Sequence, residues 1–222
     1  MGGAVPERTR PGVSPGGSDD EELLQGGRPA FRVVVVERAA LSIGIAVDPD
    51  APFVQRAREL GLLIQRRSSG GTGVLLAPGD ITWAVVLPRT DPRVGRDFVS
   101  AYGRLGAPVT RYLEERGWAA VWSPSPASSS DCCLLGGRGR VLTCPRGILS
   151  GAAQHLTRLA LLHQGTFPRR VDRPLHRAVF ATAENVAFDR LIGTDDLGLT
   201  EGPEELRDGL AAGFAQFVEF TG

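Results

Sequence analysis

A glycine-rich segment that joins two predicted strands is the feature that most restricts the fold of this chain. The segment SSGGTG at 68–73 follows the apolar run LLIQRR at 62–67 and precedes the run VLLA at 74–77. Short apolar runs bounded by glycine are typical of buried strands. Nucleotide-binding glycine loops instead lead from a strand into a helix, and this segment has neither the Lys–Ser/Thr ending of a P-loop nor the GxGxxG spacing of a dinucleotide fold. Both nucleotide-binding folds are therefore excluded.

Further strands are predicted on both sides of this segment. The runs FRVVVVE at 31–37 and LSIGIA at 41–46 are rich in β-branched residues and are separated by a brief turn, so we expect them to pair as buried strands. ITWAVVLP at 81–88 and WAAVW at 118–122 have the same character. The region 132–167 contains short apolar pieces separated by Gly and Pro, which is typical of an antiparallel meander.

Helices are predicted between and after these strands. The segment 50–61 has Asp before Pro, apolar residues at helical spacing and a closing Gly. The segment 93–117 is predicted as one long helix with a kink near Gly106 and Pro108. The chain from Arg173 is mostly helical, and the amphipathic segment 203–220 begins with proline. The fold class predicted from this order is α/β, with a mixed, largely antiparallel sheet flanked by helices.

The composition bounds the domain organisation and the kinds of partner. Residues 1–18 carry Pro, Gly and charge without an apolar core, so they are predicted to be a disordered tail, and residues 19–222 a single domain. No run approaches the roughly 20 apolar residues of a membrane helix. The 25 basic and 25 acidic residues give a formal net charge of zero, and the arginines are scattered along the chain. We therefore expect no membrane partner and no nucleic-acid partner.

Lysine and cysteine usage restricts the chemistry further. All 25 basic residues are arginine, so no Schiff base and no P-loop lysine is possible. The three cysteines, Cys132, Cys133 and Cys144, form neither a disulfide framework nor a CxxC zinc pattern. The sequence therefore predicts no metal site and a reducing, cytoplasmic compartment.

Four blocks in order resemble the lipoate-protein ligase and octanoyltransferase family, which shares its catalytic fold with biotin-protein ligases. The resemblance covers about residues 20–195, starts with DEELL, and implies a mixed sheet around an acyl-binding tunnel. Its glycine block implies contacts to the acyl chain and its activated carbonyl from Arg66, Arg67, Ser69, Gly70, Gly71 and Thr72. The blocks are RRSSGGTGV (66–74), LAPGDITWAVVLP (76–88), GILSGAAQ (147–154) and LLHQGTF (161–167).

The chain departs from the family pattern at three places. Thr72 and Gly73 stand where the family usually has a third Gly and then Ala. Leu76 and Ala77 occupy the positions of a His and an Asp that often follow the glycine block, which argues against an adenylate-forming reaction. Ile148 occupies the position of the family's catalytic lysine. The GILSGAAQ block, which contains Ile148, also implies that backbone amides near Ser150 and Gly151 stabilise a developing oxyanion.

The resemblance also implies a covalent nucleophile. Cysteine-dependent octanoyltransferases of this family carry a nucleophilic Cys upstream of the lysine position, and Cys133 stands fifteen residues before Ile148. A thiolate can take an acyl group from one thioester and pass it to an amine. A buried structural cysteine is the alternative, and Cys132 or Cys144 could fill the same role. His163 is the candidate base, and the alternative is a hydrogen-bonded structural histidine.

Three functions follow from these residues. The first is transfer of an octanoyl or lipoyl group from an acyl carrier protein or H protein, through Cys133, to the lysine of a lipoyl domain or a glycine-cleavage H protein, with no cofactor. The second is an ATP-dependent lipoate-protein ligase, which requires ATP and lipoate. The third is a non-catalytic acyl-binding protein that lacks the family lysine. Arg138, Arg140 and Arg146 could place a fixed cation where the lysine ammonium was.

Overall fold

The computed structural model describes residues 17–219 apart from 96, 128–129, 138 and 181–186. Residues 1–16 of the predicted tail and Arg138 lie outside the described residues, while helix α1 begins at Gly17. Among these described residues the helices are α1 (Gly17–Gly26), α2 (Pro52–Glu59), α3 (Phe98–Leu105), α4 (Ala107–Glu114), α5 (Arg173–Phe180), η1 (Ala187–Arg190), η2 (Thr194–Leu197) and α6 (Pro203–Glu219). The strands are β1 (Ala30–Val35), β2 (Ala40–Ile43), β3 (Leu63–Arg66), β4 (Gly73–Leu76), β5 (Ile81–Pro88), β6 (Val121–Pro124), β7 (Arg140–Cys144), β8 (Gly147–Leu156) and β9 (Ala160–Phe167).

The strands form two sheets. The larger sheet has six strands in the order β1-β5-β9-β8-β7-β6, and each neighbouring pair is antiparallel. The smaller sheet has the order β3-β2-β4, with β2 parallel to β3 and antiparallel to β4. The predicted mixed, largely antiparallel sheet flanked by helices is confirmed. The predicted meander corresponds to β7, β8 and β9, and the glycine segment joins β3 to β4 as expected.

The predicted pairing of the runs at 31–37 and 41–46 is wrong, because the two runs enter different sheets. β1 pairs with β5 in the large sheet, whereas β2 pairs with β3 and β4 in the small one. A tight hairpin needs central residues that adopt positive φ, such as Asn-Gly. Residues 36–39, which connect β1 to β2, include no glycine or asparagine, and they carry the chain from one sheet to the other.

The long helix predicted over 93–117 is two helices, α3 and α4, which meet at Gly106. A Cβ on Gly106 would lie 2.4 Å from Trp122 Nε1, so only glycine permits this approach to β6. Pro108 stands in the first turn of α4, where its missing N–H is tolerated. Asp97 sets the start of α3 because its carboxylate accepts hydrogen bonds from the backbone N–H groups of Val99 and Ser100.

Two other predicted elements also differ from the observed ones. The strand expected at 118–122 is β6 at Val121–Pro124. The piece CCLL at 132–135 is not a strand but a set of turns, attached to the start of β4 by an isolated bridge between Cys132 and Gly73. This bridge brings the two cysteines of the segment next to the end of the glycine segment.

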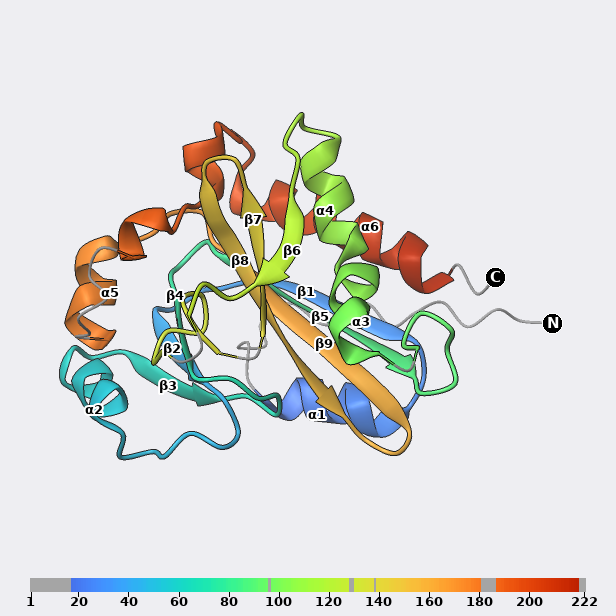
Figure 1. Ribbon diagram of the computed structural model, residues 1–222, viewed down its shortest axis with the longest axis horizontal. Helices are drawn as coiled ribbons and strands as arrows, with labels where there is room; N and C mark the ends of the chain where they lie inside the picture. The colour runs from blue at the N-terminus through green and yellow to red at the C-terminus, as the bar shows by residue number, and fades with distance from the viewer. Residues whose placement is uncertain (1–16, 96, 128–129, 138, 181–186, 220–222) are drawn as a thin grey trace.

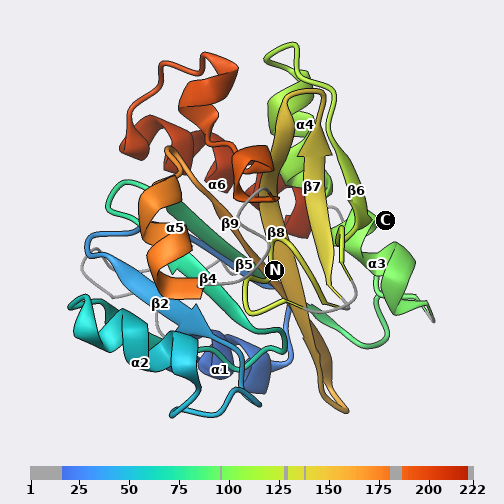
Figure 2. The same cartoon turned by 60° about the vertical axis from the view of Figure 1, so that its left-hand side comes forward.

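The helices cover both faces of the large sheet. Helices α3, α4 and α6 pack over one face, where Trp83, Val85 and Leu87 of β5 are buried in the same apolar core as residues of α4 and α6. Helix α1 packs against β5 and β9 on the other face, with Leu24 against Ala84. The small sheet lies with α2 and α5 at the opposite end of the molecule from α3 and α4 (Figures 1 and 2). In the described part of the chain, no helix has the length and apolar character needed to cross a bilayer.

Candidate active site

A cavity of about 380 Å³ lies where the two sheets meet residues 133–137 and 139. Strands of the large sheet supply one wall, and Ser42, Gln65 and Val74 of the small sheet supply the opposite wall. The glycine segment and the cysteine-bearing segment border it as well. Of the predicted site residues, those that line the cavity are Arg66, Arg67, Gly70, Gly71, Thr72, Cys133 and Gly151.

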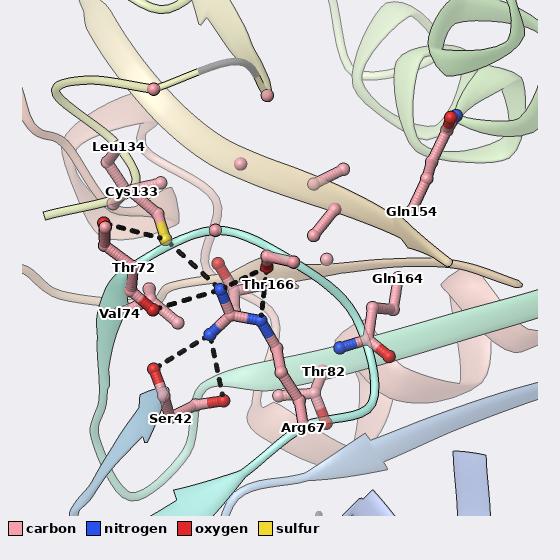
Figure 3. A pocket seen from close by; sticks show the side chains of 18 of the residues that line it. Ser42, Arg67, Thr72, Val74, Thr82, Cys133, Leu134, Gln154, Gln164 and Thr166 are labelled. Carbon is pink, nitrogen blue, oxygen red and sulfur yellow. Dashed lines mark hydrogen bonds between the residues drawn. The ribbon is translucent and has the colours of Figure 1, made fainter. Parts of the chain in front are cut away.

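The sulfur of Cys133 lies beside the guanidinium of Arg67 in this cavity (Figure 3). Arg67 Nη2 is 3.3 Å from Cys133 Sγ, and Thr72 Oγ1 is 3.5 Å from the same sulfur. Thr72 Oγ1 also donates a hydrogen bond to the carbonyl of Ser130, which orients the hydroxyl at the cysteine segment. The guanidinium is a permanent cation, and it is placed to donate a hydrogen bond to the sulfur.

Arg67 is buried and is held by neutral acceptors. Its guanidinium donates hydrogen bonds to the backbone carbonyls of Ser42 (2.9 Å), Gly70 (2.7 Å) and Thr72 (3.1 Å). Among the described residues it forms no ion pair with a carboxylate, although its side chain is only 8% exposed. The positive charge of Arg67 is therefore available to the cysteine sulfur and to an anionic or carbonyl group of a ligand.

The close approach of Arg67 and Cys133 depends on glycine at position 71. Gly71 has a φ of +92°, which side chains rarely adopt. A Cβ at this position would lie 2.7 Å from Arg67 Nη2 and 3.1 Å from Cys133 Sγ. Gly71 is therefore required both by the backbone conformation of the segment and by the two groups that meet beside it.

The other residues of the glycine block have different positions. Arg66 is exposed and donates hydrogen bonds to the carbonyls of Ile45 (2.6 Å) and Val47 (2.9 Å), so it fastens the segment after β2. Ser69 is fully buried and does not line the cavity. The carbonyl of Ser69 accepts a hydrogen bond from Ile45 N at 3.0 Å. This bond holds the glycine segment against the residues that follow β2.

Ser150 and Gly151 lie on β8, at the end of the cavity near the cysteine segment. Gly151 lines the cavity, and a Cβ on it would lie 2.6 Å from Leu134 Cδ2. Ser150 is fully buried outside the cavity lining, and its hydroxyl donates to the carbonyl of Thr166. Gly151 thus lets the segment that carries Cys133 pack directly on β8.

His163 lies in the core and not beside the thiol. It is fully buried and does not line the cavity, and its ring packs against Trp83 at 5.0 Å and Tyr102 at 5.2 Å between centroids. Its Nδ1 is 3.3 Å from Gln154 Nε2, and no hydrogen bond within the described structure joins it to Cys133. Burial lowers the pKa of His163 to about 3, so the ring is neutral near pH 7. This position does not suit the predicted role of base.

The remaining candidates lie away from the cavity. Cys132 is fully buried and Cys144 lies at the end of β7, and neither lines the cavity. Ile148 is 1% exposed and packs in the apolar core under the small sheet. Arg140 begins β7, and Arg146 donates to the carbonyl of Asp196 outside the cavity. In the described residues, no group of three or more His, Cys, Asp or Glu is placed to hold a metal ion.

The sequence analysis missed several residues of the cavity wall. Thr82 and Gln164 point into it from β5 and β9, and Tyr102 reaches it from α3. Burial raises the pKa of Tyr102, so its hydroxyl stays protonated near pH 7. Alternation along the strands was the available signal for Thr82 and Gln164, because alternate side chains share a face. The sequence alone does not tell which face of the sheet meets the cavity, so this signal could not be used.

Comparison with known proteins identifies the family. Residues 20–194 match the family model described as the lipoyl protein ligase A/B catalytic domain. A relative from Kyrpidia tusciae named octanoyl-[GcvH]:protein N-octanoyltransferase is 39% identical over 116 residues, which cover 49% of this chain and 38% of that protein.

Solved structures share the fold at low sequence identity. A lipoate-protein ligase A bound with ATP has a TM-score of 0.71 at 19% identity, covering 90% of this chain and 78% of that one. A putative lipoate protein ligase of T. acidophilum with bound lipoic acid has a TM-score of 0.71 at 18% identity, covering 97% of this chain and 86% of that one. Because the family model matches most of its length, the chain belongs to the lipoyl protein ligase A/B catalytic domain family.

Proposed function

We propose that this protein transfers an octanoyl or lipoyl group from a protein thioester to a protein lysine through an acyl-cysteine intermediate on Cys133. The observation that carries the proposal is the position of Cys133 Sγ in the cavity, 3.3 Å from Arg67 Nη2. The 39% identical relative is named for octanoyl-[GcvH] and N-octanoyl transfer to protein, which supports the same reaction class.

In the first step the thiolate of Cys133 attacks the carbonyl carbon of the donor thioester. A new S–C bond forms, the donor's C–S bond breaks, and the donor sulfur leaves as a thiolate that takes a proton from solvent. Arg67 stabilises the attacking thiolate, and its guanidinium also lies within the cavity where the carbonyl oxygen gains charge. An oxyanion donor of this kind contributes about 3 kcal/mol where one has been removed from other enzymes.

In the second step the neutral amine of the acceptor lysine attacks the carbonyl carbon of the acyl-cysteine. A C–N bond forms, the C–S bond to Cys133 breaks, and the amine proton passes to the departing thiolate or to solvent. The substrate supplies the lysine, so the absence of lysine from this chain is no obstacle. His163 has no part in either step, because it is buried outside the cavity lining.

The proposed partners are an acyl carrier protein or H protein as donor and a lipoyl domain or H protein as acceptor. A bipartite lipoate protein ligase from Thermoplasma acidophilum, similar in fold, has been described with its E2 lipoyl domain. We propose that the reaction needs no cofactor and takes place in the cytoplasm. Residues 19–222 are proposed to act as one domain, with residues 1–18 as its tail.

The ATP-dependent ligase is the second candidate, and the buried position of Ile148 argues against it. An apolar side chain in the core under the small sheet supplies no cation for a phosphate or an activated carbonyl. ATP and lipoate would be required only for this alternative. The third candidate, a non-catalytic acyl-binding protein, uses the same cavity and predicts no covalent adduct.

Intact-mass measurement and a pyrophosphate assay together separate the three candidates. The protein is incubated with octanoyl-carrier protein, and separately with ATP and lipoate. Transfer through Cys133 predicts an octanoyl adduct that hydroxylamine removes at neutral pH, and its disappearance when an acceptor lipoyl domain is added. A ligase predicts lipoate-dependent pyrophosphate release, and a binder predicts neither result. Absence of the octanoyl adduct with a donor that is shown to be intact would exclude the proposed transfer.

A further inference from the structure

The cavity ends where helix α1 begins to cover the large sheet. Thr82, Ala84 and Val86 of β5 share one face of that sheet, because alternate side chains of a strand point to the same side. Thr82 lines the cavity, whereas Ala84 and Val86 are buried in a small apolar core with Leu24 of α1. The helix therefore fills the part of this face that adjoins the cavity.

An ion pair between Asp20 and Arg32 lies at this boundary, and both residues line the cavity. Asp20 belongs to α1, and Arg32 belongs to β1, where it is paired with Ala84. Arg32 Nε donates a hydrogen bond to Asp20 Oδ1 at 3.1 Å, and a terminal nitrogen of Arg32 donates to the same oxygen. The side chains of Arg32 and Asp20 are only 5% and 7% exposed. The pair therefore fastens α1 to the sheet and closes this end of the cavity.

This closed end lies across the sheet from the thiol. The segment that carries Cys133 packs over β8, because Leu134 covers Gly151. β1 is three strands away from β8 in the order β1-β5-β9-β8. At a strand spacing of about 4.8 Å, the two strands are ~14 Å apart. Figure 3 shows Thr82 on the side of the Arg67 guanidinium away from Cys133. An acyl chain that starts at Cys133 and runs along the sheet therefore points toward the ion pair.

A buried ion pair is a firm stop for a hydrocarbon chain. Where a cavity has room for them, two further methylene groups improve binding about tenfold. Parting a buried ion pair costs more than this gain, because each charge then lacks its partner in a site with little water. A chain that already reaches the pair therefore gains no affinity from greater length.

We propose that the Asp20–Arg32 pair sets the maximum length of the acyl chain that this cavity accepts, with octanoyl as the longest straight chain that fits. The inference rests on the proposed function in one respect, that the carbonyl end of the acyl group lies at Cys133. The pair contacts the far end of the chain and takes no part in the bond changes. An octanoyl and a lipoyl group have the same main-chain length, so the pair admits both.

Calorimetric titration of the full-length protein with hexanoate, octanoate and decanoate tests this limit. We expect octanoate to bind about tenfold more tightly than hexanoate, because the added methylenes enter the cavity. Decanoate should bind no more tightly than octanoate, because its last methylenes meet the ion pair. The break in the series between octanoate and decanoate is the predicted signature of the wall.

Asp20→Ala combined with Arg32→Ala removes the wall without leaving a single buried charge. In this double variant decanoate should bind about tenfold more tightly than octanoate, so the break disappears. The matched control is Arg177→Ala combined with Asp189→Ala, which removes an ion pair of 2.6 Å between α5 and η1 outside the cavity lining. The control protein should keep the break. Thermal unfolding shows whether each variant is folded.

Several results would overturn the inference. These are a further tenfold gain from octanoate to decanoate in the wild type, no binding of any of the three acids, or an unchanged break in the folded Asp20→Ala/Arg32→Ala protein. If that variant does not fold, the wild-type series decides alone.

Acylation by octanoyl- and decanoyl-pantetheine separates this inference from the proposed function. Adducts that form at equal rates with both donors leave transfer intact and remove the length limit. A break in the binding series without any adduct removes transfer and keeps the length limit. Adduct formation at least tenfold faster with the octanoyl donor supports both.

Discussion

Arg67 and Cys133 are 66 positions apart in the chain, yet Arg67 Nη2 lies 3.3 Å from Cys133 Sγ. The guanidinium reaches the sulfur from the end of β3, and the sulfur comes from the turns that precede β7. Glycine at position 71 leaves the space in which the two groups meet. The candidate nucleophile therefore has a permanent cation beside it, whereas His163 lies outside the cavity lining.

Removal of the Arg67 charge should slow the reaction of the thiol. We expect Arg67→Met to lower the alkylation rate of Cys133 by iodoacetamide at pH 7 about tenfold, because one charge-assisted hydrogen bond is worth ~1.5 kcal/mol. Mass spectrometry of the peptide that contains Cys133 measures the rate. Arg58→Met, which removes an exposed arginine on α2, is the matched control. An unchanged rate in a folded Arg67→Met protein would show that the cation does not act on the sulfur.

Cys133→Ser should abolish the octanoyl adduct while the protein stays folded. The change removes the polarisable thiolate and adds a desolvation cost of about 1–3 kcal/mol at most. Cys132→Ser should retain the adduct, because Cys132 is fully buried outside the cavity. Intact mass and thermal unfolding are measured on both variants. Transfer at the wild-type rate by Cys133→Ser would remove this residue from the mechanism.

Gly71→Ala should reduce acylation strongly. The new Cβ would lie 2.7 Å from Arg67 Nη2, and alanine at a φ of +92° is strained by roughly 1–2 kcal/mol. We expect the acylation rate to fall at least tenfold, with a lower unfolding temperature. Gly103→Ala on α3 is the control, since nothing lies within 4 Å of its Cβ and alanine favours the helix. Wild-type acylation by Gly71→Ala would show that the contact between Arg67 and Cys133 is dispensable.

The buried His163 should make the protein less stable in acid. Its pKa is lowered to about 3 by burial, below the unfolded value of about 6.5, so the unfolded chain binds the proton more tightly. Stability is therefore lost as the pH falls from 6.5 toward 3, by up to ~5 kcal/mol. His163→Gln, which can still bond to Gln154, should lack this loss in denaturant titrations across that range. An equal acid loss in both proteins would contradict the prediction, and acylation by the variant would confirm that His163 is not the base.

Asp80 should have the opposite pH dependence. It is 3% exposed, and burial raises its pKa from 3.8 to about 6 despite hydrogen bonds from the backbone N–H groups of Ala77 and Arg169. A raised folded pKa means that the contribution to stability is present at low pH and is lost as the pH rises from about 4 to 6, by roughly 3 kcal/mol. The difference in unfolding free energy between wild type and Asp80→Asn should therefore change across this window. A constant difference would show that Asp80 titrates normally.

Much of the fold could be predicted from local patterns. β-branched runs marked β1 and β5, and prolines marked the first turns of α2 and α6. The glycine segment had two strands as its neighbours. The break at Gly106 was expected only as a kink, because the side chain that forces it, Trp122, comes from a distant strand. The separation of β1 from β2 was missed because pairing partners are chosen by long-range register and not by sequence adjacency.

The candidate site was only partly predictable for a similar reason. His163 and Gln164 are neighbours on β9, and the sequence drew attention to the histidine. Pairing of β9 with β5 turns Gln164 toward the cavity and His163 into the core, because adjacent side chains point to opposite faces. The roles of Cys133 and the glycine block stay predictions until adduct formation is measured.

The sequence by itself determined the family blocks, the absence of lysine, the strand-to-strand glycine segment and the presence of three thiols. These are properties of residue identity and short-range spacing. Only the tertiary structure decided which thiol enters the cavity, which arginine of the 66–67 pair lies beside it, and that an ion pair closes the far end. Each of these depends on the pairing of strands far apart in the chain, and pairing is set by the packing of whole sheets, which no local segment specifies.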